Sequence, residues 1–363
     1  MRHRLRAPRL YVAGCLPQGS HRETCHGDAE LAALSASDTV RSRIVGLAVD
    51  IAAKASLARL EAFPGLRLLA LSTRGREVSP DLPLSVLPRL RYLDLAGWQG
   101  DVPGSGMLLP LFRQLRTLRW PASLRGPVPV PCQLERVSGP LTEDGARALA
   151  ACSRLRELSS DQLEFRFTSA EPIAALRHLE RLHLRHFRAT ELAALAGLVE
   201  LRRLSLSASA AADFDFLARL PRLESLDLSQ SKLSSLAALA HATGLRELDV
   251  GFTDVSDLAP LRALTGLVRL RLHHTQAVDL GPLAALRGLK ELSVANTAVV
   301  ELQPLAGHPA LEWVILYESR VTDIAPLFTL PRLRRANIAR LSLSAAQKQQ
   351  LLQRLGRSNV DDF

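Results

Sequence analysis

Leucines recur every 22 residues over much of this sequence, and that spacing constrains the fold more than any other feature. The series is Leu201, Leu223, Leu245, Leu267, Leu289, Leu311 and Leu333. A fixed period of this length is typical of a solenoid, in which each repeat buries its apolar ridge against its neighbours. The sequence therefore predicts one elongated repeat domain with a long face left open to solvent.

The apolar spacing changes midway through each repeat, as in the unit that begins at Leu245. Leu248 and Val250 alternate with Glu247 and Asp249, which predicts a short strand with one buried face. A spacing of three residues follows, at Leu258, Leu261 and Leu264. That spacing predicts a short helical or 3₁₀ return on the far side of the repeat.

Two polar positions also recur with the repeat. An aspartate stands just before the return and can cap its free N–H groups, at Asp213, Asp257, Asp279 and Asp323. A hydroxyl stands at the turn that leaves the strand, at Thr253, Thr275, Thr297 and Ser319. We expect these hydroxyls to bond backbone groups that the turn leaves unpaired.

The N-terminal half keeps the pattern with irregular steps. Its repeats start at Ile44, Leu66, Leu90, Leu115, Leu134, Leu155 and Leu179. We expect the extra residues in loops at 97–106 and 161–169, and a proline-rich segment at 127–131 in place of one return. The predicted organisation is an N-terminal segment at 1–43, disordered in part or capping, with a weak helix at 28–34. A solenoid at 44–340 follows, irregular over 66–178 and regular over 179–338.

The C-terminal segment, 341–363, is predicted to close the solenoid. Ser344 can cap a helix that ends near Gly356, and Leu351, Leu352 and Leu355 would cover the last leucine layer.

The run Asp257-Leu-Ala-Pro-Leu261-x-x-Leu264, with its counterparts at Asp279 and Asp323, resembles the leucine-rich repeat superfamily and its 22-residue, internalin-like bacterial class. The resemblance covers residues 44–340. It implies an α/β solenoid, a curved horseshoe with a parallel β-sheet on its concave side and short helical or 3₁₀ returns on its convex side. It also implies protein binding as the usual activity.

The net charge of +10 and the pI of about 10.2 raise the alternative of a nucleic-acid-binding basic solenoid. Among the 46 basic residues, however, lysine occurs only at Lys54, Lys232, Lys290 and Lys348. The arginines are dispersed among 36 acidic residues, whereas a phosphate-binding groove needs clustered positive charge. We therefore expect a solvated surface rather than a nucleic-acid groove.

No motif for catalysis, phosphate binding or dinucleotide binding occurs, so we expect neither an enzyme nor a cofactor. No apolar run is long enough to span a membrane. Residues 12–15 look like a lipoprotein cleavage box ending at Cys15, but the hydrophobic core of such a signal is missing. The sequence thus favours a cytoplasmic monomer, with an exported or surface-attached adhesin or effector, lipid-anchored through Cys15, as the alternative.

The four cysteines form no recognisable framework. Cys132 and Cys152 fall in neighbouring coils and could approach one another, yet two buried thiols in a reducing compartment is the favoured interpretation. The spacing of Cys15, Cys25 and the nearby histidines, His21 and His26, fits no zinc pattern, so no metal site is expected.

The third and fifth residues of each repeat should face away from the core, on the concave sheet. They predict an acidic patch (Asp227, Glu247, Asp249), a basic strip one repeat further on (Arg269, Arg271, His273, His274) and a bulky cluster (Trp313, Ile315, Tyr317), with Phe252 and Glu318 at the rim. The alternative is that the charges pair across the sheet while the aromatics cover their stems. Paired histidines could also bind a metal, but adjacent strand residues should point to opposite sides.

Exposed Trp, Tyr and Arg residues dominate the energetics of protein interfaces. We therefore interpret the chain as a non-enzymatic scaffold that binds an unknown protein partner through the concave face between Asp227 and Glu318.

Overall fold

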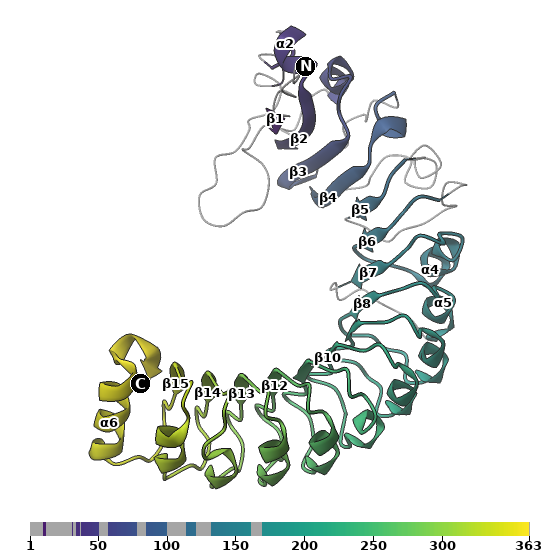
Figure 1. Cartoon of the computed structure of the whole chain (residues 1–363). Helices are drawn as coiled ribbons and strands as arrows, with labels where there is room; N and C mark the ends of the chain where they lie inside the picture. Colours follow the sequence, from purple (N-terminus) through teal and green to yellow (C-terminus); the bar gives the residue numbers. More distant parts are fainter. Residues whose placement is uncertain are drawn as a thin grey trace, which may run out of the picture. The chain divides into compact units, whose positions relative to one another are not determined.

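The computed structural model describes residues 10–11, 31, 34–36, 38–50, 57–77, 85–99, 114–120, 132–160 and 169–362. The chain divides into two compact units, Met1–Glu164 and Phe165–Phe363. In each unit, parallel strands follow one another in chain order and lie on one side, while short helical returns lie on the other (Figure 1). This is the open repeat architecture that the sequence predicts.

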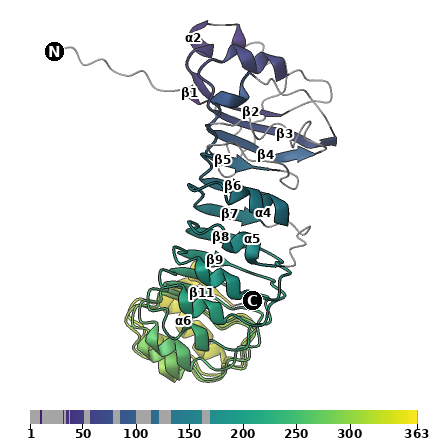
Figure 2. The same ribbon diagram turned by 90° about the vertical axis from the view of Figure 1, so that its right-hand side faces the viewer.

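The first unit contains β1 (Leu10–Tyr11), α2 (Asp38–Arg41), β2 (Ile44–Asp50), η1 (Leu57–Ala62), β3 (Leu68–Glu77), η2 (Leu87–Arg89), β4 (Tyr92–Gln99), β5 (Thr117–Arg119), β6 (Arg136–Ser138), α4 (Glu143–Leu149) and β7 (Glu157–Ser160). Its strands stack as successive rungs, with α4 to one side (Figure 2). Strands β3 and β4 have 10 and 8 residues, longer than the short strands expected. Part of the loop expected at 97–106 is therefore strand, because β4 continues through Gln99.

The second unit contains α5 (Glu171–Ala174), β8 (Arg181–Leu184), η4 (Ala193–Gly197), β9 (Arg203–Ser205), η5 (Asp215–Arg219), β10 (Ser225–Asp227), η6 (Ala237–Leu239), β11 (Glu247–Asp249), η7 (Ala259–Ala263), β12 (Arg269–Arg271), η8 (Gly281–Ala285), β13 (Glu291–Ser293), η9 (Gln303–Leu305), β14 (Trp313–Ile315), η10 (Ala325–Thr329), β15 (Arg335–Asn337), α6 (Ala345–Leu355), η11 (Arg357–Asn359) and β16 (Val360–Asp361). The strands β10 to β15 lie on the inner side of a gentle curve, with the 3₁₀ returns outside (Figure 1).

The register of the second unit is set by the 22-residue period. Leu226 pairs with Leu248, and Leu248 with Leu270, so that equivalent residues of neighbouring repeats lie side by side. The repeat leucines are buried, as at Leu267 and Leu289, which have no exposed surface. Burying one such side chain contributes about 1.5–3 kcal/mol, so the stacked leucine columns drive the folding of this unit.

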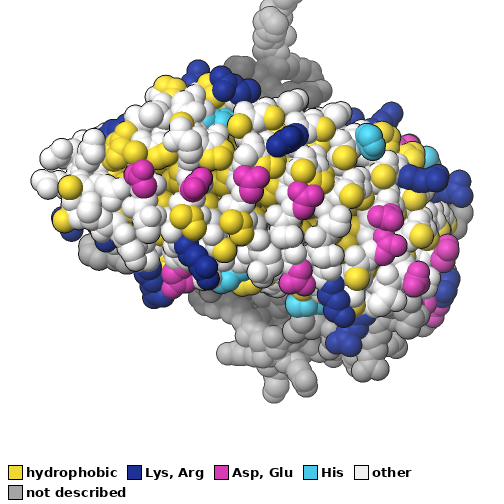
Figure 3. All heavy atoms as spheres, turned by 90° about the horizontal axis from the view of Figure 1, so that it is seen from below, with side chains coloured by type: hydrophobic (Ala, Val, Ile, Leu, Met, Phe, Trp, Pro, Cys, Tyr) yellow, Lys and Arg dark blue, Asp and Glu magenta, His cyan; other side chains and the backbone are white. Residues whose placement is uncertain are grey.

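The two recurrent polar positions behave largely as predicted. The Asp257 Oδ1 accepts a hydrogen bond of 2.8 Å from the Ala259 N–H, and Asp213, Asp279 and Asp323 make the equivalent bond. From the side of the returns, acidic side chains recur in a row (Figure 3). The Thr253 Oγ1 donates to the Val250 carbonyl at 2.6 Å, as do Thr275 and Thr297 in their own repeats. Ser319 is the exception, since its buried hydroxyl has no partner among the described residues.

A column of residues with left-handed backbone runs along the edge of the second unit, one per repeat, with φ between 53° and 60°. Its members are His186, Ala208, Gln230, Phe252, His274, Asn296, Glu318 and Arg340. None is glycine, and each costs about 1–3 kcal/mol of backbone strain. Hydrogen bonds to the next repeat offset that cost: the Phe252 N–H, for example, donates to the His273 carbonyl at 2.9 Å. The column therefore presents a row of side chains beside the strand ends.

The C-terminal helix is confirmed. Ser344 and Gln347 form a reciprocal capping box at the start of α6, and Gly356 ends it with a φ of 81°. Leu351 is fully buried, and the Arg354 Nη1 donates to the Leu327 carbonyl at 2.7 Å, so the helix packs on the last coil. The short strand β16 follows and pairs with β15. The sequence did not predict β16.

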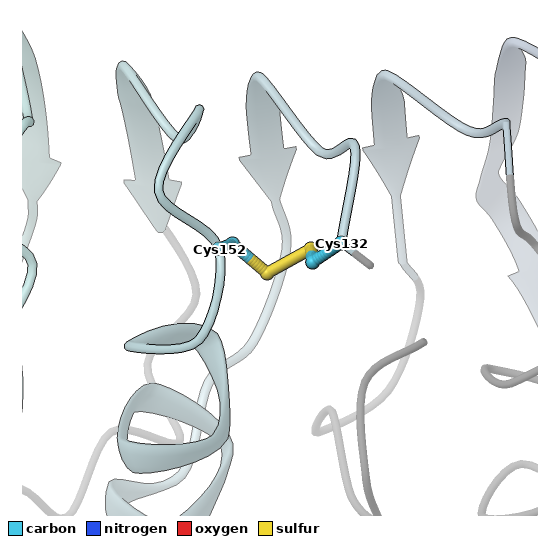
Figure 4. The surroundings of a disulfide bond; sticks show 2 residues. All are labelled: Cys132 and Cys152. Atoms are coloured by element: carbon cyan, nitrogen blue, oxygen red, sulfur yellow. A yellow bond between two sulfur atoms is a disulfide. The ribbon is translucent and has the colours of Figure 1, made fainter. Parts of the chain in front are cut away.

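Cys132 and Cys152 form a disulfide, so the prediction of two buried thiols is wrong (Figure 4). The Cα atoms lie 4.9 Å apart, within the range that a disulfide requires. The bond joins the segments that precede β6 and β7, so it crosslinks adjacent coils of the first unit.

Three of the other sequence predictions lie wholly or mostly outside the described residues. They are the proline-rich segment at 127–131, the loop at 161–168 and the helix at 28–34, of which Leu31 and Leu34 are described and are helical.

Candidate interaction face

The sheet face of β8 to β15 presents the third and fifth residues of each repeat, as expected. Most of these side chains are partly or fully exposed, including Asp227, Asp249 and Arg271. Ser293 is an exception, because its small side chain is buried between its larger neighbours, Arg271 on β12 and Ile315 on β14. The residues here called the interaction face are these two columns from β10 to β15.

The acidic patch and the basic strip form ion pairs with each other across the sheet. This is the arrangement that the sequence analysis gave as the alternative to a binding site. The Arg269 guanidinium contacts Glu247 on one side and Glu291 on the other, at 2.7 Å each. The Arg271 Nη1 lies 3.5 Å from the Asp249 Oδ2. Exposed ion pairs of this kind contribute only about 0–1 kcal/mol each, so they shape the charge pattern more than the stability.

Asp227 differs from its neighbours because hydroxyl and amide groups hold it. It lies beside Asp249, as predicted from the strand spacing. Its Oδ2 accepts from the Ser205 hydroxyl at 2.9 Å, and its Oδ1 accepts from the Ser229 N–H and hydroxyl at 3.0 and 2.7 Å. Among the described residues it makes no ion pair, so the Asp227 charge is left uncompensated.

The bulky cluster of Trp313, Ile315 and Tyr317 is only partly exposed, contrary to the prediction of an exposed tryptophan. The Arg335 guanidinium lies 5.0 Å from the centre of the Trp313 ring, and that of Arg340 lies 5.4 Å from the Tyr317 ring. Cation–π contacts of this kind contribute about 0.5–1 kcal/mol at exposed sites. The arginines of the next repeat thus cover the aromatic rings. The Trp313 indole N–H has no hydrogen-bond partner among the described residues.

Phe252, His273 and His274 form an aromatic group at the rim. The Phe252 ring stacks on His274 with centroids 4.1 Å apart and meets His273 edge-on at 5.2 Å. The expectation that the two histidines point to opposite sides is therefore wrong. Strand alternation fails here because His273 and His274 lie beyond β12, and His274 has left-handed backbone.

Burial lowers the pKa of His273 below its ordinary value of 6.5, with His274 and Arg271 acting in the same direction and Asp249 and Asp227 opposing them. The imidazole is therefore neutral at physiological pH. Its ring lies over Gly251, where an added Cβ would approach within 2.2 Å of the His273 Cε1. The absence of a side chain at Gly251 thus allows the imidazole to lie close to the backbone of the preceding repeat.

A shallow groove of about 360 Å³ continues from His274 along the rim, past Asn296 to Glu318 and Arg320. The Asn296 Nδ2 donates to Glu318 at 2.6 Å, and Glu318 is also hydrogen-bonded to Arg340. That bond to Arg340 is the main reason that the pKa of Glu318 is lowered. Asn296 and Arg340 are not among the residues predicted for the site. Their spacing of 22 residues from His274 and Glu318 is the signal that could have revealed them.

The described residues contain no group of three His, Cys, Asp or Glu side chains placed to hold a metal ion. Cys15, His21, Cys25 and His26 lie outside those residues. Within the same part of the chain, every helix is too short or too polar to cross a bilayer.

No family model matches the sequence, and no curated protein matches it. Among solved structures, an internalin (InlF) of Listeria monocytogenes superposes with a TM-score of 0.67 at 22% identity, over 84% of this chain and 92% of that one. A leucine-rich repeat protein of Leptospira interrogans gives 0.59 at 16% identity, over 90% and 92%. TLR13, in a complex with ssRNA13, gives 0.62 at 17% identity, over 82% of this chain and 47% of that one. At these identities the likeness is one of fold.

Proposed function

The chain has the leucine-rich repeat fold shared with internalins, and on that premise we propose that it is a non-enzymatic protein that binds a protein partner through the interaction face. The observation that carries the proposal is the clustering of Trp313, Ile315 and Tyr317 on one strand of the interaction face and its adjoining turn. The equivalent positions in the neighbouring repeats hold charged, polar or small residues. Aromatic anchors beside arginines are typical of binding hot spots.

The charge balance of the interaction face favours a protein over a nucleic acid. Arg269 and Arg271 are both paired with carboxylates of neighbouring strands. A polyanion would have to displace those carboxylates, whereas nucleic-acid grooves present unpaired clusters of positive charge. The resemblance to TLR13 in its RNA complex is one of fold and does not alter this balance.

Site-specific photocrosslinking tests the proposed face. A photoreactive amino acid at Ile315, which lies on the sheet, should capture the partner in the native host. The same group at Val278, which is exposed and lies outside the strands, should capture none. Capture from both positions to the same extent, or from Val278 alone, would place the interface elsewhere on the chain.

Once the partner is captured, changing Trp313 and Tyr317 together to alanine should weaken its binding by about 2 kcal/mol or more, roughly 30-fold. Titration calorimetry measures the affinity, and circular dichroism checks that the variant is folded. Because Trp313 is half-buried beneath Arg335, some stability should also be lost. The control is Val278→Ala, at the exposed position outside the strands, which should leave the affinity unchanged. Unchanged affinity in a folded double variant would exclude the aromatic cluster as the anchor.

We further propose that the protein works in an oxidising compartment, which supports the exported alternative over the cytoplasmic one. The Cys132–Cys152 disulfide carries this proposal, since disulfides persist outside the cytosol and are rare within it. Alkylation of the protein from host cells provides the test. Both cysteines are buried, so the cells are lysed directly into denaturant and alkylating reagent. Both should resist labelling until a reductant is added, and immediate labelling of both would show that the protein works in a reducing compartment.

A further inference from the structure

We propose that the rim group Phe252, His273 and His274, together with Asp227 and Asp249, binds an arginine or lysine side chain of the partner. This inference rests on the proposed function and specifies the chemistry of one contact within it. The site consists of an exposed aromatic surface and two neighbouring carboxylates that act on His273. That combination recognises a cation that carries an apolar stem.

The Phe252 ring is not needed by the fold. Its side chain is 46% exposed although its backbone is left-handed, a conformation that disfavours bulky residues. The same position holds Ala208 and Gln230 in the two preceding repeats, so the backbone accepts small and polar side chains there. An exposed, strained phenylalanine among such neighbours indicates a role in binding.

The three rings form a preformed platform. His274 covers one face of Phe252 at 4.1 Å, and His273 meets its edge at 5.2 Å. Since the remaining surface of Phe252 is exposed, a guanidinium or ammonium group can approach it without moving the histidines. Planar guanidinium groups stack well on such rings, and each contact contributes about 0.5–1 kcal/mol when exposed.

The local charge favours a cation. Asp249 accepts a hydrogen bond of 3.0 Å from the N–H of Gly251, the residue over which the His273 ring lies. Asp227 lies beside Asp249 on the neighbouring strand, and both carboxylates act electrostatically on His273. One arginine, Arg271, lies at 3.5 Å from Asp249, and Asp227 has no ion pair among the described residues. Two carboxylates facing one arginine leave a net negative charge beside a neutral imidazole. A partner's basic side chain would restore neutrality.

The proposal also predicts a pH dependence. The groups that act on His273 are Asp249, His274, Arg271 and Asp227, and burial keeps its imidazole neutral at physiological pH. Below that range, protonation of His273 would add positive charge beside the Phe252 ring and repel the ligand cation. Binding of the basic side chain should therefore weaken as the pH falls.

The test uses the full chain and two capped tripeptides, acetyl-Gly-Arg-Gly-amide and its citrulline analogue, which has the same shape without the charge. Titration is followed by NMR through the imidazole C–H signals of His273 and His274. At about pH 7.5 the arginine peptide should shift these signals saturably, with a Kd at least about tenfold below that of the citrulline peptide. The difference should narrow as the pH is lowered below 6.5, because His273 gains a proton only there.

Three variants identify the contacts. Phe252→Ala and Asp227→Asn should each weaken arginine-peptide binding at least about fivefold. The matched control is His186→Ala, which has the same backbone conformation three repeats away and should leave the affinity unchanged. Gly251→Ala displaces the His273 ring without removing it and should also weaken binding.

Equal binding of the two peptides, or no saturable shift up to about 50 mM, would overturn the cation site. The outcome is separable from that of the proposed function. If the photocrosslinker at Ile315 still captures the partner while the peptides do not bind, only the rim inference fails. If the peptides bind and Ile315 captures nothing, the interaction face fails instead.

Discussion

At the scale of single residues, backbone geometry fixes some positions and leaves others open to function. Gly139 and Gly251 illustrate the difference. Gly139 has a φ of 129°, and an added Cβ would lie 2.1 Å from the Trp120 carbonyl oxygen. At Gly251 an added Cβ would meet the His273 ring, which is a side chain and can rotate. The φ of Gly251 is not in the left-handed region.

We therefore predict that Gly139→Ala lowers the free energy of unfolding by about 1–3 kcal/mol or more, because backbone atoms must move. Gly251→Ala should cost less than about 1 kcal/mol, because a side chain can rotate away. Urea denaturation of both variants measures the difference. Similar losses for the two would mean that the His273 ring is as fixed as backbone.

His308 is a second residue whose surroundings make a measurable prediction. It is 2% exposed; its Nδ1 accepts from the Ala310 N–H, so its Nε2–H donates to the Leu286 carbonyl at 2.8 Å. Burial lowers the pKa of His308 below 6.5, with Arg287 acting in the same direction and the bond to Leu286 opposing them. The unfolded chain consequently binds a proton more readily than the folded one.

The stabilisation from neutral His308 should be fully present above about pH 6.5 and be lost as the pH falls toward its folded-state pKa. His308→Gln, which does not titrate, should reduce the loss of stability between about pH 7.5 and 5.5. Denaturation at both pH values checks this. His178→Gln, at an exposed position, serves as the control, and an equal reduction in that variant would argue against the buried histidine.

At the scale of elements, the repeat could be predicted well because neighbouring coils dictate its geometry. The strand containing Leu248, the return after Asp257 and the helix after Ser344 each follow from local spacing and capping. The stacking of Phe252 on His274 could not be predicted, because it depends on the left-handed backbone at both residues. Nor could the cover over Trp313, since it comes from Arg335 in the next repeat.

The capping box gives the prediction for this scale. Ser344→Ala removes the hydroxyl that accepts from the Gln347 N–H and should cost about 0.5–2 kcal/mol. Hydrogen exchange should show the loss in α6 and the last coil, where Arg354 contacts Leu327, and none around Leu245. Ser342→Ala, at an exposed position before the cap, is the control. Uniform loss of protection across the second unit would contradict a local cap.

At the scale of the whole molecule, the disulfide should make the first unit sensitive to reductant and leave the second unit insensitive. It closes a loop across a sequence separation of 20 residues within the first unit. The sequence did not predict the disulfide. The repeat spacing indicates that Cys132 and Cys152 lie in neighbouring coils, but it does not determine whether their thiols are oxidised. The effect of the disulfide on stability should remain within the first unit, since contacts in a repeat array join nearest neighbours.

Replacing Cys132 and Cys152 together by serine should lower the stability of the first unit by about 3 kcal/mol. Proteolysis followed by mass spectrometry should find the new cleavage sites before Glu164 and leave the second unit intact. The wild-type chain treated with a reductant is the parallel measurement. Early cleavage near Leu289 would show that the two units unfold together.

The common step of β9 to β15 also bears on how such a gene can change. Leu226, Leu248 and Leu270 occupy interchangeable places in their ladders, so a recombination event that adds or removes one whole copy leaves every remaining strand paired. An event of any other length shifts the ladder and exposes a leucine layer. Unequal crossing-over between copies can therefore lengthen or shorten the binding surface by whole repeats without preventing the protein from folding. The solvent-facing side chains of a repeat are then gained or lost together.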